Sequence, residues 1–256
     1  MKQIVLNFLV ALQFLTTLPV PLWRSATSED VGRSVRYFPV VGLVLGIILA
    51  SLNWFFRLWL PPALSDLLLV ISLLLLSGAL HLDGFLDSCD GLFGYRTTEQ
   101  RLEIMHDSRV GSFGVAGGFA LLSLKYVSLS SIPTDLKTAA LLLAPLLGRW
   151  ALVTSVVLFP YGRESGLGTI YKRYTTKLSL ALTSLVIALF TSLILGGPGL
   201  LLALLIFGVA LLVGKYIMLK LPKGLTGDSY GAIAEIGEMV TWLFLGAAAN
   251  MIHSLA

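Results

Sequence analysis

The sequence predicts an all-α protein, a polytopic helical membrane bundle that forms a single domain over residues 1–256. Its 256 residues are 56% hydrophobic and only 12% charged, and the mean hydropathy is +0.88, well outside the range of soluble globular proteins. Apolar runs of about 17 to 22 residues recur along the chain, each long enough to cross about 30 Å of hydrocarbon. We therefore expect an integral membrane protein without a soluble domain of useful size.

Seven of these runs predict spans, followed here in chain order. They cover residues 39–58, 64–81, 113–131, 138–159, 178–195, 200–219 and 239–255. Before them, an apolar stretch at 4–22 contains Gln13, Thr16, Pro19 and Pro21, so we expect an interfacial, re-entrant or spanning N-terminal helix. No small-residue cleavage site follows this stretch, which argues against a cleaved signal peptide.

The charged residues predict which ends of the spans face the cytoplasm. If the acidic loop at 82–112 is cytoplasmic, all but four of the 18 Lys and Arg residues lie on that side. Arg57, Lys125 and Lys137 fall toward the opposite face, and Arg149 lies within a span. This asymmetry follows the positive-inside rule. Because the charges are spread over several short loops, a nucleic-acid partner is not expected.

The connections differ in length between the two sides. The outer ones are short, at 60–63, 131–137 and 196–199, whereas the inner ones are longer and polar, at 23–38, 82–112, 160–177 and 220–238. Since function concentrates in long loops, we expect the active-site loops to be 82–112 and 220–238, facing the cytoplasm.

The most informative inner segment is His81-Leu-Asp-Gly-Phe-Leu-Asp-Ser-Cys-Asp-Gly91. In a helix, at about 100° per residue, Asp83, Asp87 and Asp90 share one face. Carboxylates this close to a low-dielectric region repel one another unless they take up protons or bind a hard cation, typically Mg²⁺ bridging to phosphate. We therefore expect a magnesium–phosphate site, with His81 placed to orient an aspartate or move a proton. A solvated loop with helix-capping aspartates is the alternative.

A second inner segment, Glu103–Gly114, leads directly into the next span. Asp107 and Arg109 beside glycines suit a further carboxylate near the metal and a guanidinium for phosphate oxygens. The alternative is that Arg109 only anchors the span that follows.

A third segment, Gly224–Glu238, is again acidic and rich in glycine. Asp228 and Glu235 are seven positions apart and can share a helix face. Two such loops on one side of the membrane suggest two halves of one site. Capping of the final helix by Thr226 and Asp228 is the alternative.

Two single residues complete the residue-level predictions. A guanidinium is costly to bury in a membrane, so we expect Arg149 to face the bundle interior and pair with an acid or a phosphate. Cys89 is the single cysteine, which excludes an internal disulfide. Among hard oxygen ligands it is expected to be a small filler and not a metal ligand.

Taken in order, several segments resemble the cobalamin synthase family. The matching pieces are Gln13–Pro19, Tyr37–Gly42, His81–Gly94, Asp107–Gly114 and Thr226–Ala232. The resemblance implies a multi-pass enzyme of the bacterial cytoplasmic (inner) membrane with adenosylcobinamide-GDP ribazoletransferase activity. In the implied reaction the ribose 3′-hydroxyl of α-ribazole, or of α-ribazole 5′-phosphate, attacks the pyrophosphate of adenosylcobinamide-GDP and GMP leaves, in a phosphoryl-group transfer with Mg²⁺.

The resemblance also implies roles for individual residues. Asp83, Asp87 and Asp90 would hold the metal against the pyrophosphate, and Asp107 or His81 would orient the attacking hydroxyl. The residues expected to contact substrate are Arg36, Ser108, Arg109, Thr226, Gly227, Asp228 and Glu235. The lipid bilayer is the other expected partner, and a homo-oligomer is left open.

Two other classes of protein remain as alternatives. CDP-alcohol phosphotransferases begin their motif with Asp-x-x-Asp-Gly, as Asp87–Gly91 does, but Gly94 and Tyr95 stand where Ala-Arg is expected. An ion-coupled transporter is the competing class. The acids argue against it because they lie in boundary loops and not within spans.

Overall fold

The computed structural model describes the backbone of residues 2–255 and the side chains of residues 2–247. Within these residues the chain is helical and forms no strand. The helices are α1 (Lys2–Leu15), α2 (Ser28–Ser34), the 3₁₀ turn η1 (Val35–Tyr37), α3 (Phe38–Phe56), α4 (Pro62–Leu76), α5 (Leu80–Leu92), α6 (Thr98–Ile104), α7 (Ser112–Ser130), α8 (Thr134–Leu158), α9 (Leu167–Tyr174), α10 (Lys177–Leu195), α11 (Gly197–Lys220) and α12 (Gly227–Leu255).

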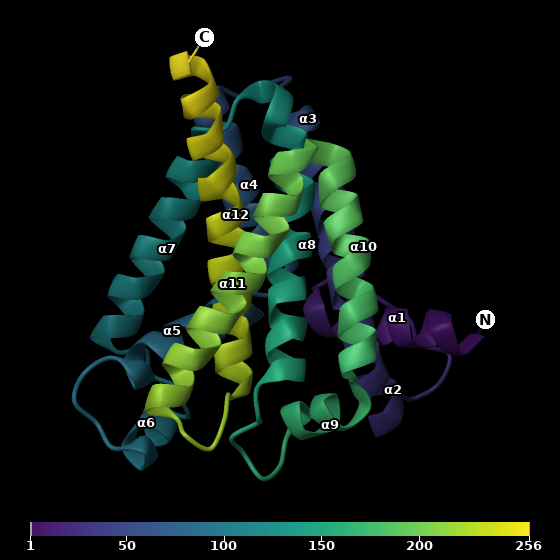
Figure 1. Cartoon of the computed structure of the whole chain (residues 1–256), viewed down its shortest axis with the longest axis vertical. Helices are drawn as coiled ribbons and strands as arrows, with labels where there is room; N and C mark the ends of the chain where they lie inside the picture. The colour runs from purple at the N-terminus through teal and green to yellow at the C-terminus, as the bar shows by residue number, and fades with distance from the viewer. Residues whose placement is uncertain (1, 256) are drawn as a thin grey trace.

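The long helices stand side by side as a bundle, and the short helices α6 and α9 lie at one end of it (Figure 1). We call this end, where α5 also meets the start of α12, the loop end. The seven predicted spans correspond to α3, α4, α7, α8, α10, α11 and α12. Among the described residues, five segments are long and apolar enough to cross a membrane, namely Ser28–Phe56, α7, α8, α10 and α11, and the bent pair α4–α5 is a sixth only if it is counted as one broken span. The predicted helical membrane bundle is confirmed, with a slightly smaller number of clear spans.

Helix α8 forms the centre of the bundle and is almost entirely buried. Helix α3 packs against it through Gly42 and Gly46. A Cβ atom added at Gly42 would lie 2.3 Å from the Pro145 carbonyl oxygen, so only glycine allows the two backbones to come this close. Small residues at helix contacts are the usual means of close packing in membranes.

The second predicted span, 64–81, is wrong at its carboxyl end. Helix α4 ends at Leu76, and the chain turns by 89° into α5. Gly78 and Ala79 both have positive φ angles, of 61° and 56°, which costs a residue with a Cβ about 1–2 kcal/mol. The backbone N–H of Thr17 donates to the Leu76 carbonyl at 2.8 Å and thereby satisfies the end of α4. Helix α5 consequently runs across the bundle and carries its acids outside the spans.

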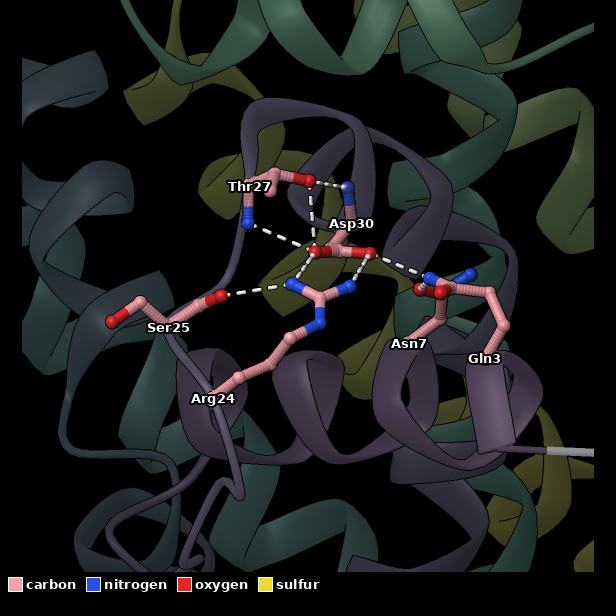
Figure 2. Close-up of polar contacts among 6 residues, drawn as sticks. All are labelled: Gln3, Asn7, Arg24, Ser25, Thr27 and Asp30. Atoms are coloured by element: carbon pink, nitrogen blue, oxygen red, sulfur yellow. Dashed lines mark hydrogen bonds and ion pairs between the residues drawn. The ribbon is translucent and has the colours of Figure 1, made fainter.

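Helix α1 lies crosswise to the long helices (Figure 1). Its 14 residues extend about 21 Å, too short for the hydrocarbon thickness of about 30 Å. Of the three alternatives for this segment, the structure favours an interfacial helix. A polar cluster holds it in place (Figure 2): buried Asp30 accepts hydrogen bonds from Gln3 of α1 and from Thr27, and forms an ion pair with Arg24 at 2.6 Å.

The opposite end of the bundle is held by a second polar cluster. Buried Asp66 of α4 pairs with Arg57 at 2.9 Å and with Lys137 at 3.2 Å. The ammonium of Lys137 also donates to the Leu129 carbonyl. Arg57 and Lys137 therefore lie away from the loop end, as predicted, and they join the ends of α3, α4, α7 and α8.

Candidate active site

A cavity of about 310 Å³ opens at the loop end, between the start of α5 and the start of α12. Helices α1, α3, α8 and α9 complete its wall. Its polar and aromatic lining residues are Phe14, Phe38, His81, Asp83, Tyr161, Arg163, Ser165, Tyr171, Asp228 and Tyr230. Several glycines between these side chains expose backbone to the space, among them Gly84, Gly168, Gly227 and Gly231.

Helices α5 and α12 touch at their backbones. A Cβ atom at Gly84 would lie 2.8 Å from the Cα atom of Asp228, and one at Gly231 would lie 3.0 Å from the His81 carbonyl oxygen. The two acidic, glycine-rich segments singled out in the sequence are thus brought against each other. Asp83 from the first and Asp228 from the second line the same cavity.

The acids at this contact repel one another. Burial raises the pKa of Asp87 to about 6, and the negative charges of Asp83, Asp228 and Asp90 add to the effect. Helix α5, bent by 89° from α4, is not one of the five segments long and apolar enough to cross a membrane in the described residues, so Asp87 lies outside these five spans. A carboxyl group with a pKa near neutrality, among carboxylates, is typical of a site that takes up a cation or a proton.

Arg163 is a site residue that sequence reasoning missed, apart from its contribution to the positive inner face. Its guanidinium pairs with Asp228 at 3.0 Å and lines the cavity. An isolated bridge between Tyr161 and Leu225 holds the two loops together, with the Gly162 N–H donating to the Leu225 carbonyl at 2.8 Å. This pairing joins segments about sixty residues apart, and no local pattern predicts it.

Asp90 has a different environment from Asp83 and Asp87. Its two carboxylate oxygens accept hydrogen bonds from the backbone N–H groups of Gly111 at 2.7 Å and Gly114 at 2.8 Å. These are amino-terminal groups of α7 that have no partner within the helix. Asp90, expected as a metal ligand, therefore caps α7, which is the role that the sequence left as the alternative.

Asp107 and Arg109 bind each other and not the cavity. Their ion pair measures 2.6 Å, and the hydrogen bond from Arg109 holds the pKa of Asp107 low, at about 2. Both residues line a second space of about 440 Å³, the outer hollow, together with Asp90 and Arg96. Ser108 between them is exposed.

Arg36, the remaining predicted phosphate contact, lies in yet another place. It borders a separate space together with Arg33 and Arg173, and its Nε donates to the Arg33 carbonyl at 3.0 Å. Of Arg36, Arg109 and Arg163, only Arg163 lies on the cavity wall.

Glu235 was expected at the substrate but is placed in a buried charge network. It pairs with Lys125 of α7, which also pairs with Glu238 at 2.5 Å. Glu238 in turn pairs with Arg149 of α8. The predicted burial and pairing of Arg149 with an acid is confirmed. Lys125 was counted with the residues that lie toward the outer face. The structure instead buries its side chain in the interior of the bundle.

Thr226 and Gly227 lie at the amino-terminal end of α12. The Thr226 hydroxyl accepts a hydrogen bond from the Ser229 N–H at 3.3 Å and donates to Asp228 at 3.2 Å. Thr226 is fully buried and positions Asp228, whereas Gly227 is exposed and lines the cavity.

Two polar side chains of the cavity wall have no partner among the residues that the structure describes. Both ring nitrogens of His81 and the hydroxyl of Tyr230 are buried without a hydrogen bond. Each such group costs about 1–3 kcal/mol. Native proteins leave few of them, so these atoms are candidates for contact with a ligand.

The residues fit a magnesium ion by their chemistry, since Asp83, Asp87 and Asp228 offer hard oxygen ligands that repel one another. Within the described part of the chain, no three His, Cys, Asp or Glu side chains converge closely enough to hold an ion by themselves. Phosphate oxygens and water commonly complete such a magnesium site.

Comparison with known proteins gives a consistent result. The sequence model of the family described as cobalamin-5-phosphate synthase matches residues 7–246. A protein of Roseiflexus sp. (strain RS-1) named adenosylcobinamide-GDP ribazoletransferase is 42% identical over 242 residues, which is 94% of this chain and 89% of the relative. Proteins with the same name from Geotalea daltonii and Stutzerimonas stutzeri are 38% and 41% identical, over 94% and 91% of this chain and 96% and 94% of theirs. No solved structure matches the chain.

Proposed function

This chain belongs to the cobalamin-5-phosphate synthase family, and we propose that it transfers ribazole to adenosylcobinamide-GDP at the cavity between α5 and α12. It is a transferase of cobalamin synthesis. The observation that carries the assignment to this place is the meeting of Asp83 and Asp228, from two distant acidic segments, on the wall of one cavity.

The arrangement along α5 suggests how the two substrates lie. Asp83 borders the cavity, Asp90 borders the outer hollow, and the seven positions between them span about 10 Å of helix. A pyrophosphate along this acidic face would place ribazole at the cavity. The guanosine part would then lie toward the outer hollow, where Arg96 and Arg109 are available for contact.

In the reaction the ribose 3′-hydroxyl attacks the phosphorus atom that carries the cobinamide. A new P–O bond to ribose forms, the P–O bond to the GMP part breaks, and GMP leaves with the electron pair. His81, on the cavity wall and without another partner in the described residues, would orient the hydroxyl and accept its proton. Asp107 is less suited to this role because it is held by Arg109 outside the cavity.

The negative charge on the transferred phosphate group must be neutralised. The carboxylates by themselves would repel this group. Asp83, Asp87 and Asp228 would hold Mg²⁺, which when bound neutralises charge on the pyrophosphate and on departing GMP. Arg163, beside Asp228, would add a guanidinium for phosphate oxygens. Asp90 would keep α7 in place at the far end of the acidic face.

We further propose that the loop end faces the cytoplasm of the bacterial inner membrane. The positive residues of the inner loops support this orientation. It places the site on the side where nucleotide substrates are made.

The test uses the purified chain in detergent or lipid nanodiscs. Adenosylcobinamide-GDP is supplied with α-ribazole or α-ribazole 5′-phosphate and Mg²⁺, with and without EDTA, and both GMP and the corrinoid product are followed. We expect both products only when all components are present. GMP release that does not need ribazole, or no product from folded protein, would contradict the transferase assignment. Turnover that continues in EDTA would contradict the proposed role of Mg²⁺ but not the transferase assignment.

A further inference from the structure

The cavity has an aromatic side formed by three helices. Phe14 of α1 stacks on Phe38 of α3, with ring centroids 6.0 Å apart, and Tyr171 of α9 meets both rings edge-on at 5.9 and 5.7 Å. Across the cavity Tyr161 and Tyr230 stack on each other at 6.2 Å. Walls of this kind favour a flat, apolar ring as ligand.

Two polar side chains of the cavity wall are buried without a partner in the described part of the chain, and two acids border the same space. Tyr230 and His81 are each only 3% exposed, and the phenol hydroxyl and both imidazole nitrogens have no partner among the described residues. The carboxylates of Asp83 and Asp228 border the same space. The ligand should therefore be mainly aromatic, accept a hydrogen bond from the Tyr230 hydroxyl, and present a polar end to the acids.

The size of the cavity decides between the substrates of the proposed reaction. Its volume is about 310 Å³, at the small end of the range of about 300–1,000 Å³ for pockets that hold drug-sized ligands. A corrinoid is far too large for it, whereas a single nucleoside fits.

Two nucleosides take part in that reaction, and their bases differ in chemistry. Guanine carries donors and acceptors along most of its edge and would leave them unpaired against Phe14, Phe38 and Tyr171, at a cost of about 1–3 kcal/mol each. The benzimidazole of ribazole is apolar except for one acceptor nitrogen, which matches the buried hydroxyl of Tyr230 that has no partner among the described residues.

On the basis of the proposed function, we propose that the cavity binds the ribazole nucleoside, with its base against the wall formed by Phe14, Phe38 and Tyr171 and its ring nitrogen accepting from the Tyr230 hydroxyl. The ribose then lies toward His81 and Asp83, where the 3′-hydroxyl meets the phosphorus atom. Phe14 and Tyr230 are thereby assigned as residues that determine which base is accepted.

The test measures binding and turnover separately. Tyr230→Phe removes only the hydroxyl, and Phe14→Ala removes one aromatic wall that is partly exposed. Tyr95→Phe and Phe119→Ala, at exposed positions away from the cavity, are the matched controls. α-Ribazole affinity is measured by calorimetry without the second substrate, and KM is measured for each substrate.

We expect Tyr230→Phe to weaken α-ribazole binding about two- to tenfold, as for one lost hydrogen bond, and to raise its KM by the same factor without changing the KM of adenosylcobinamide-GDP. Phe14→Ala should weaken binding similarly and change the preference between benzimidazole nucleosides with and without ring methyl groups. The controls should do neither.

Unchanged α-ribazole affinity in both variants would overturn the proposal. A rise in the KM of adenosylcobinamide-GDP alone would assign the cavity to guanine instead. Binding of GMP and not of ribazole in the cavity would do the same. If the wild-type chain binds α-ribazole but forms no product, the proposed function fails while the binding proposal stands, so the two failures are distinguishable.

Discussion

Replacing Asp87 by Asn should stabilise the metal-free protein while removing its activity. The amide keeps the shape of the side chain but removes the charge that Asp83, Asp228 and Asp90 repel. Burial and these charges raise the pKa of Asp87 from 3.8 to about 6, equivalent to about 3 kcal/mol in full. Because the side chain is only partly buried, screening leaves on the order of 1 kcal/mol, or an increase of about 2–4 °C in the unfolding temperature.

The measurement is thermal unfolding in detergent with EDTA, followed by tryptophan fluorescence, alongside GMP release with Mg²⁺. We expect the variant to unfold at a higher temperature than wild type in EDTA and to lose activity on the order of 100-fold, since a metal ligand supplies several kcal/mol to such a transition state. Saturating Mg²⁺ should stabilise wild type more than the variant. Asp135→Asn, at an exposed acid in the first turn of α8, is the control. Full activity of the Asp87→Asn protein, or a lower unfolding temperature in EDTA, would refute the reasoning.

Three further outcomes follow from the same geometry. The stability difference between wild type and Asp87→Asn in EDTA should fall to about half as pH falls from 7.5 to 5 and disappear only below the ordinary carboxyl pKa of 3.8, because a carboxyl whose folded-state pKa is raised to about 6 favours folding below that value and this contribution is lost as pH rises through it; a difference that is constant with pH contradicts it. Arg163→Gln should release Asp228 from its 3.0 Å ion pair and lower kcat/KM about tenfold, measured with adenosylcobinamide-GDP as the varied substrate; an unchanged value places Arg163 outside the reaction. Arg149→Met should destabilise the bundle by about 3–5 kcal/mol because it leaves the buried carboxylates of Glu235 and Glu238 with Lys125 as their one remaining cation in this network, whereas adding Glu238→Gln should recover part of the loss; equal unfolding temperatures for the single and double variants would argue against coupling.

Hydropathy predicted the helices of the bundle well, because a span is a local property of about twenty residues. The bend after α4 was not predictable in this way. Gly78 lies in an apolar run, and Ala79 adopts a positive φ angle without a turn residue to announce it. The hydrogen bond from Thr17 that completes the end of α4 comes from about sixty residues earlier in the chain. Local patterns contain no trace of such a partner.

The acids on α5 were predictable for the same local reason, since helical spacing alone puts Asp83 and Asp87 on one face. Their neighbours were not. The cap that Asp90 provides depends on where α7 begins, and Glu235 turns away from the cavity because Lys125 lies within reach on α7. Arg163 reaches the site through the pairing of two loops. Each of these depends on which helices become neighbours, and helical spacing does not determine that.

The buried charge network has a consequence for how the chain is made. Lys125 and Arg149 belong to α7 and α8, whereas their acidic partners Glu235 and Glu238 belong to α12, which is synthesised after both of these helices. During synthesis the two cations must enter the membrane before any partner exists, at a cost of about 2.5–3.5 kcal/mol each on the insertion scale. Arrival of α12 removes this cost, so insertion of α12 completes the charge network of the bundle. A nascent chain that stops before residue 227 carries two uncompensated charges, a signal by which membrane quality control can recognise it as unfinished.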